Sequence, residues 1–207
     1  MIDVLITVVW IVGICNSINF FDNLDGGAAG TTAVTAIALT YLAISNGQTF
    51  IGSMALVVAG ASFGFLIWNK PPAQIYMGDA GALFLGVLVA TLTIRLNPDT
   101  ESIIASLATP VLLLAVPILD TSVAVISRLR RRVSPFQGGK DHLSHRMIRA
   151  GNSRKITVLF LCSLSTFFSL LAVLINLSSP FNEFLLVAFS ALIWLGLLAG
   201  FLSCRDE

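Results

Sequence analysis

Charged residues are scarce in this 207-residue sequence: Asp, Glu, Lys and Arg make up 11% of it, while hydrophobic residues make up 56%. Soluble domains usually carry about 25% charged residues, so this composition excludes an ordinary soluble domain. The mean hydropathy of +0.90 leads to the same conclusion. We therefore expect an integral membrane protein that lies in a lipid bilayer, and we expect no nucleic-acid partner.

Three further patterns are missing. The cysteines Cys15, Cys162 and Cys204 are odd in number and form no CxxC or metal-ligand spacing, which favours inert thiols in the membrane. The N-terminus has no basic region, and no small-residue cleavage site follows its apolar run, so this run predicts a membrane helix rather than a cleaved signal. The apolar runs do not alternate with polar residues, which excludes a transmembrane barrel.

The sequence does contain long apolar runs. Their approximate ranges are 2–17, 27–44, 50–68, 80–96, 103–127, 156–177 and 184–202. Each is long enough, or nearly so, to cross a bilayer as a helix. We expect an all-α, polytopic bundle of about seven transmembrane helices, which forms a single domain over residues 1–207.

Basic residues lie almost entirely on one side of this predicted topology. Lys70 lies in the third connection, nine Lys and Arg residues lie in the fifth between positions 128 and 155, and only Arg95 lies on the opposite side. Because cytoplasmic loops carry an excess of Lys and Arg, the odd-numbered connections should be cytoplasmic and the N-terminus external. We expect a plasma-membrane protein.

The three unusual polar stretches, 16–27, 69–81 and 134–146, all fall in odd-numbered connections. The even-numbered connections at 45–49 and 97–102 have the composition of ordinary turns. The sequence therefore predicts one composite active site on the cytoplasmic rim, built from loops that are far apart along the chain.

In the first polar stretch, Asp22 and Asp25 are three residues apart and share one face if the segment is helical. Two close carboxylates repel each other unless a cation lies between them. Asn16 and Asn19 repeat the spacing and add neutral oxygen ligands, and an all-oxygen set suits Mg²⁺ or Mn²⁺. The alternative is a solvated loop in which Asp25 and the following glycines only cap a helix.

In the second stretch, Gly78 and Gly81 flank Asp79 and would let a ligand approach the backbone. Asp79 lies where a helix should begin, so it is either a metal or phosphate site or an N-cap. Tyr76 is either a platform for a nucleotide base or an interfacial anchor.

The fifth apolar run contains Asp120, which is either functional or a structural carboxylate paired with an arginine or hydroxyl. The loop after it holds both histidines of the chain, His142 and His145, beside Asp141. No third soft ligand is near, which argues against zinc. Imidazole and guanidinium groups in this loop could instead hold a phosphate.

These stretches together resemble the polyprenyl-phosphate N-acetylhexosamine-1-phosphate transferases, a family that includes the phospho-N-acetylmuramoyl-pentapeptide transferase. The resemblance lies in their order, spacing and shared side. The carrying segments are Asn16 to Gly26, Asn69 to Gly81, Pro117 to Asp120, Ser134 to Phe136 and Asp141 to Arg146.

The resemblance implies that a polyprenyl phosphate, commonly undecaprenyl phosphate, attacks the β-phosphorus of a UDP-N-acetylhexosamine, such as UDP-GlcNAc, and that UMP leaves. Mg²⁺, or Mn²⁺ in its place, would be the cofactor. By similarity, Asp79 is the metal ligand and Asn19 a second one. The catalytic residues implied are Asp22, Asp25, His142 and His145, and the substrate-binding residues are Asn16, Asn69, Tyr76, Gly78, Lys140, Asp141 and Arg146.

Two departures from the family pattern matter. The middle position of the family's histidine motif is Ser144 here, and the chain has no Asp-Asp pair, although the family carries adjacent aspartates in an earlier loop. We therefore expect the chain to be the C-terminal portion of a longer transferase. The alternatives are an inactive remnant of the family or a membrane transporter that uses Asp120 and the proline-broken fifth run. The sequence leaves a homodimer open.

Overall fold

The computed structural model describes residues 2–98, 100, 102–135 and 139–204, and within these ranges the regular structure is entirely helical. The helices are α1 (Ile2–Phe21), α2 (Gly27–Ser45), α3 (Thr49–Asn69), α4 (Gly78–Arg95), α5 (Ile103–Leu113), α6 (Ala115–Arg130), α7 (Leu143–Arg149), α8 (Arg154–Asn176) and α9 (Pro180–Ser203). Six of them are long and apolar enough to cross a membrane, and α5 with α6 can form a seventh, bent span. The predicted multi-pass helical bundle is confirmed.

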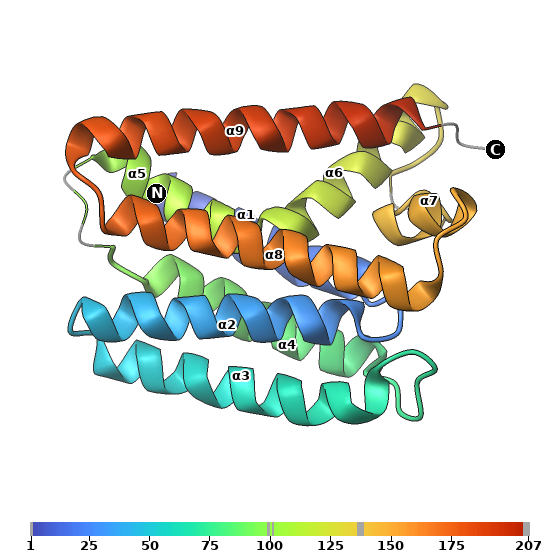
Figure 1. Cartoon of the computed structure of the whole chain (residues 1–207), viewed down its shortest axis with the longest axis horizontal. Helices are drawn as coiled ribbons and strands as arrows, with labels where there is room; N and C mark the ends of the chain where they lie inside the picture. Colours follow the sequence, from blue (N-terminus) through green and yellow to red (C-terminus); the bar gives the residue numbers. More distant parts are fainter. Residues whose placement is uncertain (1, 99, 101, 136–138, 205–207) are drawn as a thin grey trace.

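Helix α2 is the centre of the bundle. In its apolar window, 72% of the residues are buried, against 6% for α9 and 22% for α1. Its small residues allow α3 and α8 to pack closely on it. At Gly30, for example, an added Cβ would lie 2.6 Å from the Sγ atom of Cys162. Figure 1 shows α2 between α3 and α8, with α9 along the outer edge.

Helix α1 packs mainly against α4. At the crossing, a Cβ on Gly86 would lie 2.7 Å from the Cα atom of Cys15, so only glycine allows this approach. Helix α1 also runs to Phe21, about one turn beyond the predicted end near residue 17. Asn19 therefore lies on the same helix as Asn16 and not in a loop.

The fifth apolar run was predicted as one span, but it breaks at Leu114, and its halves meet at 76°. Proline has no N–H and its ring clashes with the carbonyl four residues earlier, so Pro117 frees the carbonyl of Leu113. Thr35 of α2 donates a hydrogen bond to this carbonyl over 2.7 Å. Trp194 of α9 likewise donates to the carbonyl of Ala115 over 3.1 Å.

The connections α1–α2 and α3–α4 and the loop that contains α7 lie at the same end of the bundle (Figure 1). The short helix α7 was not predicted. The single-domain prediction for residues 1–207 remains a prediction. Phe136, part of the predicted histidine-loop motif, lies outside the described residues.

Candidate active site at the polar end of the bundle

Hydrogen bonds connect the first two polar stretches. Asn69, at the end of α3, is only 2% exposed. Its Oδ1 atom accepts from the Gly26 N–H over 2.9 Å, and its Nδ2 atom donates to the Ile75 carbonyl over 2.9 Å. In addition, the Ala73 N–H donates to Asp25 over 3.3 Å. Asn69 therefore holds the α1–α2 turn and the α3–α4 loop together.

Three carboxylates on these two segments are close enough to interact electrostatically. Asp22 and Asp25 are half-buried and Asp79 is exposed. Burial, and then the charges of Asp25 and Asp79, raise the pKa of Asp22 from 3.8 to about 6. The repulsion shows uncompensated negative charge, which a divalent cation would relieve. The only positive side chain paired with this group in the described ranges is the exposed Arg154, 3.8 Å from Asp25.

The donor set fits Mg²⁺ or Mn²⁺ chemically, since carboxylate oxygens are the ligands that these cations prefer. No three His, Cys, Asp or Glu side chains among the described residues are close enough to form a finished metal site. Asp79 lies in the first turn of α4, whose N-cap is Met77, so the alternative that Asp79 is the N-cap is wrong. Gly78, which opens this helix, has a positive φ of 65°.

The side chains around Asp79 differ in exposure. Tyr76 is 75% exposed, so its ring is free to meet a ligand. Asn19 is half-buried on α1. Asn16 is exposed, and its amide donates to the Val12 carbonyl of its own helix over 2.7 Å.

The third polar stretch is built on a buried network around His142. Asp120, which is 0% exposed, accepts from His142 Nδ1 over 2.6 Å and from the Leu143 N–H over 2.7 Å. The predicted structural alternative for Asp120, a pair with an arginine or hydroxyl, is corrected: its partners are an imidazole and a backbone N–H. Helix α6 brings Asp120 to the loop. Asp120 and His142 are far apart in the sequence, so no local sequence pattern shows their contact.

Arg128 completes this network. Its guanidinium holds Asp141 with two bonds of 2.9 and 3.2 Å, donates to the Pro135 carbonyl over 2.7 Å and lies 3.3 Å from His142 Nε2. Because arginine can only donate, Nε2 of His142 accepts, and its Nδ1 carries the hydrogen given to Asp120. Both nitrogens of His142 are thus engaged within the protein.

The pKa of Asp141 reflects two opposing effects. Burial alone would raise it, but the hydrogen bond and charge of Arg128, together with the charge of Arg131, hold the pKa of this carboxyl below its usual value. Arg131 reaches the carboxylate over 2.6 Å from the surface. Asp141 is therefore ionised, and its carboxylate pairs with both Arg128 and Arg131.

His145 is the more accessible imidazole. Its ring is half-buried, 6.3 Å from that of His142, and no hydrogen bond is found to it within the described part of the chain. Burial and then positive charges nearby, Arg149 among them, lower the pKa of His145. The ring is therefore neutral near pH 7.

Of two predicted substrate-binding residues of this loop, one is part of the framework and the other is exposed. Arg146 is buried and donates to the carbonyls of Asp141, Phe201 and Cys204 and to the Ser127 hydroxyl, so it ties α7 to the end of α9. Lys140 is exposed, and its carbonyl accepts from Arg149 over 2.7 Å.

Three residues that sequence reasoning missed complete the site. Arg128 was counted with the basic residues that set topology, although it is buried. Asn23 lies between the two predicted aspartates and accepts a hydrogen bond from Ser144, which lies between the two histidines. The only sequence signal for these residues was Ser144 itself, which stands at the middle position of the histidine motif, where the family often has a histidine.

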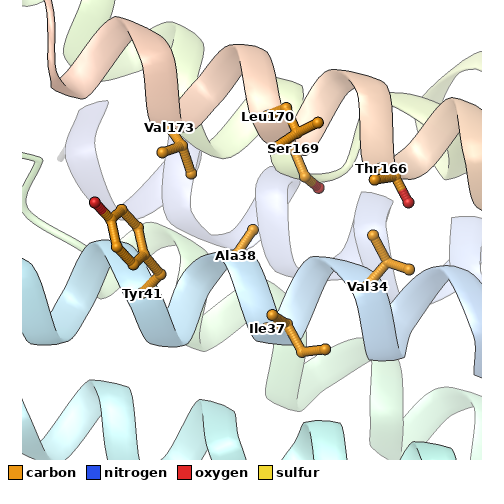
Figure 2. A pocket seen from close by; sticks show the side chains of 8 residues that line it. All are labelled: Val34, Ile37, Ala38, Tyr41, Thr166, Ser169, Leu170 and Val173. Atoms are coloured by element: carbon orange, nitrogen blue, oxygen red, sulfur yellow. The ribbon is translucent and has the colours of Figure 1, made fainter.

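Besides a groove of about 440 Å³ between α8 and α9, two apolar grooves lie along the spans. One, of about 530 Å³, lies between α1 and α6 and is lined at one end by Ser17 and Thr121, close to the polar residues. The other, of about 490 Å³, lies between α2 and α8. Figure 2 shows its lining from Val34 to Tyr41 on α2 and from Thr166 to Val173 on α8.

Comparison with known proteins gives a consistent result. Residues 1–97 match the model of glycosyl transferase family 4. A probable undecaprenyl-phosphate N-acetylglucosaminyl 1-phosphate transferase of Bacillus subtilis is 36% identical over 192 residues, which cover 91% of this chain and 53% of that protein.

Two further relatives have related names. A decaprenyl-phosphate N-acetylglucosaminephosphotransferase of Mycolicibacterium smegmatis is 34% identical over 77% of this chain and 44% of its own length. A phospho-N-acetylmuramoyl-pentapeptide-transferase of Staphylococcus saprophyticus is 30% identical over 79% of this chain and 49% of its own length. The chain spans about half the length of these curated relatives.

Proposed function

Because this chain belongs to glycosyl transferase family 4, we propose that its protein transfers N-acetylhexosamine 1-phosphate from a UDP-sugar, UDP-GlcNAc first among them, to a polyprenyl phosphate such as undecaprenyl phosphate. The observation that carries the proposal is the meeting of three polar segments at one end of a membrane bundle. Such a product would begin a cell-wall or surface polysaccharide.

In the proposed reaction, an oxygen of the lipid phosphate attacks the β-phosphorus of the UDP-sugar. A new P–O bond forms, the bond between that phosphorus and the bridging oxygen of the α-phosphate breaks, and UMP leaves with the electron pair. A bound Mg²⁺ or Mn²⁺ would neutralise the diphosphate and the leaving group. Asp79 and Asn19 are the proposed ligands, beside the carboxylates of Asp22 and Asp25.

The ring of Tyr76 is proposed to stack on the uracil base; its exposure supports this role, since an aromatic ring can stack on any base. The backbone at Gly78 has no side chain to obstruct the diphosphate, and nothing in the described chain would meet a Cβ there. The neutral ring of His145 can hold a proton at the acceptor phosphate, whose second pKa is about 6.

The groove between α1 and α6 is the proposed seat of the polyprenyl tail. Its lining is apolar along the span, from Leu5 to Ile14, and it ends at Ser17 and Thr121. Thr121 follows Asp120, so a tail in this groove would bring its phosphate to the polar end. The α2–α8 groove has no comparable connection to the site, since its lining begins at Val34, about two turns into α2.

The polar end is proposed to face the cytoplasm, where nucleotide sugars are made. Lys70 and the nine basic residues between 128 and 155 belong to connections at this end, whereas Arg95 ends α4 at the other. This distribution favours a plasma-membrane protein with a cytoplasmic active face.

The test is UMP release from UDP-GlcNAc and undecaprenyl phosphate by the purified full-length protein, with and without Mg²⁺. We expect Mg²⁺-dependent release that Asp79→Asn lowers by at least about 100-fold. Asp3→Asn, at the far end of α1, is the matched control and should keep normal activity. Undiminished, metal-independent release by Asp79→Asn would refute the ligand assignment, and no release by the unsubstituted protein would refute the function.

A further inference from the structure

One hydrogen bond joins the carboxylate turn to the histidine helix. The Ser144 hydroxyl, in the first turn of α7, donates to Oδ1 of Asn23, 121 residues away in the α1–α2 turn. Ser144 is only 1% exposed. Nδ2 of Asn23 donates to the Phe20 carbonyl over 2.6 Å, which fixes the amide with Oδ1 toward Ser144. A flipped amide would set its oxygen against that carbonyl, so the orientation is determined.

Each partner lies between two residues of the proposed site. Asn23 follows Asp22 and precedes Asp25 by two positions, while Ser144 lies between His142 and His145. The rings of Phe20 and His142 also lie close, with centroids 6.2 Å apart. The contact therefore lies where the carboxylates and the imidazoles approach each other.

The other hydrogen bonds that anchor α7 lead away from this turn. Asp120 holds its beginning to α6, and Arg146 holds it to the end of α9 and to Ser127. Among the residues that the structure describes, Ser144 makes the only side-chain hydrogen bond from α7 to the α1–α2 turn. Without it, α7 would remain anchored to α6 and α9, but its distance from the carboxylates would no longer be fixed by a hydrogen bond.

We propose that Asn23 and Ser144 form a positioning pair, which sets the separation between the Asp22 and Asp25 carboxylates and the His145 imidazole without touching the substrate. Its kinetic consequence rests on the proposed function, because the pair matters to turnover only if these groups act on one reacting phosphate. A misplacement of about 1 Å can lower a rate about 100-fold, which is the scale on which such a pair acts.

The test compares Ser144→Ala, Ser144→Thr, Asn23→Ala and the double variant in the full-length protein in lipid nanodiscs. The position of His145 is followed by the NMR resonance of its ring, assigned by its loss in His145→Gln. Ser144→Ala and Asn23→Ala should shift this resonance equally, and the double variant should shift it no further. Ser144→Thr keeps a hydroxyl and should retain the original resonance.

The kinetic measurement uses UDP-GlcNAc and undecaprenyl phosphate. Ser144→Ala should lower kcat by about 10-fold to 100-fold while KM for UDP-GlcNAc stays within about twofold, since no substrate contact is lost. Ser178→Ala removes an exposed hydroxyl that donates to the Leu174 carbonyl at the other end of the bundle, and it should change neither kcat nor the spectrum.

An unshifted His145 resonance in Ser144→Ala would overturn the pair. A shifted resonance with unchanged kcat would overturn its role in turnover, as would a rise in KM alone. If the unsubstituted protein releases no UMP, the proposed function and the kinetic role fall together, and the resonances still decide whether the pair holds α7 in place. A melting temperature measured for each variant separates local displacement from unfolding.

Discussion

Arg128→Met should destabilise the protein far more than Arg131→Met, although both arginines hold Asp141. The two side chains differ in burial: that of Arg128 is 4% exposed and that of Arg131 is 45% exposed. Removing one partner of a buried pair leaves an uncompensated charge and costs about 3 to 5 kcal/mol. An exposed partner contributes about 0 to 1 kcal/mol.

Further losses add to the effect at Arg128. The Pro135 carbonyl and Nε2 of His142 lose their donor as well. The double variant Arg128→Met with Asp141→Leu should be more stable than Arg128→Met alone, because it removes the stranded carboxylate. Equilibrium unfolding in mixed detergent micelles, followed by circular dichroism, measures all three.

Acid provides a second measurement on the same network. The pKa of Asp141 is lowered in the folded state, so its ionised form stabilises the protein above the ordinary carboxyl pKa of about 4. This stability is lost as the pH falls through the lower, folded-state pKa. The loss should be absent from the double variant. Equal destabilisation by Arg128→Met and Arg131→Met would refute the reasoning, because burial would then not decide the energy.

Two further predictions concern the carboxylate end. Asn69→Ala should lower the free energy of unfolding by about 1 to 3 kcal/mol, because the buried Gly26 N–H loses its acceptor, whereas Gln74→Ala, on the exposed loop, should change it little; equal effects would contradict the role given to Asn69. Asp22, with its pKa raised to about 6, favours the folded state while protonated, so without divalent cation its contribution should be lost as the pH rises from about 4 to about 6. Asp22→Asn should abolish this slope and Mg²⁺ should reduce it, as thermal unfolding at several pH values will show; a slope of opposite sign would contradict the assignment.

The sequence predicted the bundle well because bilayer thickness fixes the length of apolar runs. It missed the break at Leu114, since Pro110 is tolerated inside α5 whereas Pro117 interrupts the helix. The outcome depends on Thr35, which is far away in sequence and supplies the replacement donor. No local pattern contains that information.

For the site, the spacing of the acidic residues and histidines in the sequence identified them as candidates. The predicted topology then placed them at one end of the bundle. The division of labour within the histidine loop did not follow. His142 and His145 are the same residue type and have similar neighbours in the sequence. Only the fold brings Asp120 to Nδ1 and Arg128 to Nε2 of His142. Arg146 resembled a phosphate-binding residue because charge alone does not reveal that four protein acceptors already surround it.

The bend between α5 and α6 has a mechanical consequence. Thr35 and Trp194 hold the carbonyls on either side of it from two different helices. Opening the bend would break both bonds. The Ala115 carbonyl would keep the Leu119 N–H of its own helix, but the Leu113 carbonyl, which Pro117 cannot serve, would be left without a donor, and an unpaired carbonyl in hydrocarbon costs several kcal/mol. The bend is therefore a rigid feature of the bundle and not a hinge. A transporter would need this segment to move. An enzyme that takes one substrate from the lipid and one from water can work with a fixed arrangement of helices.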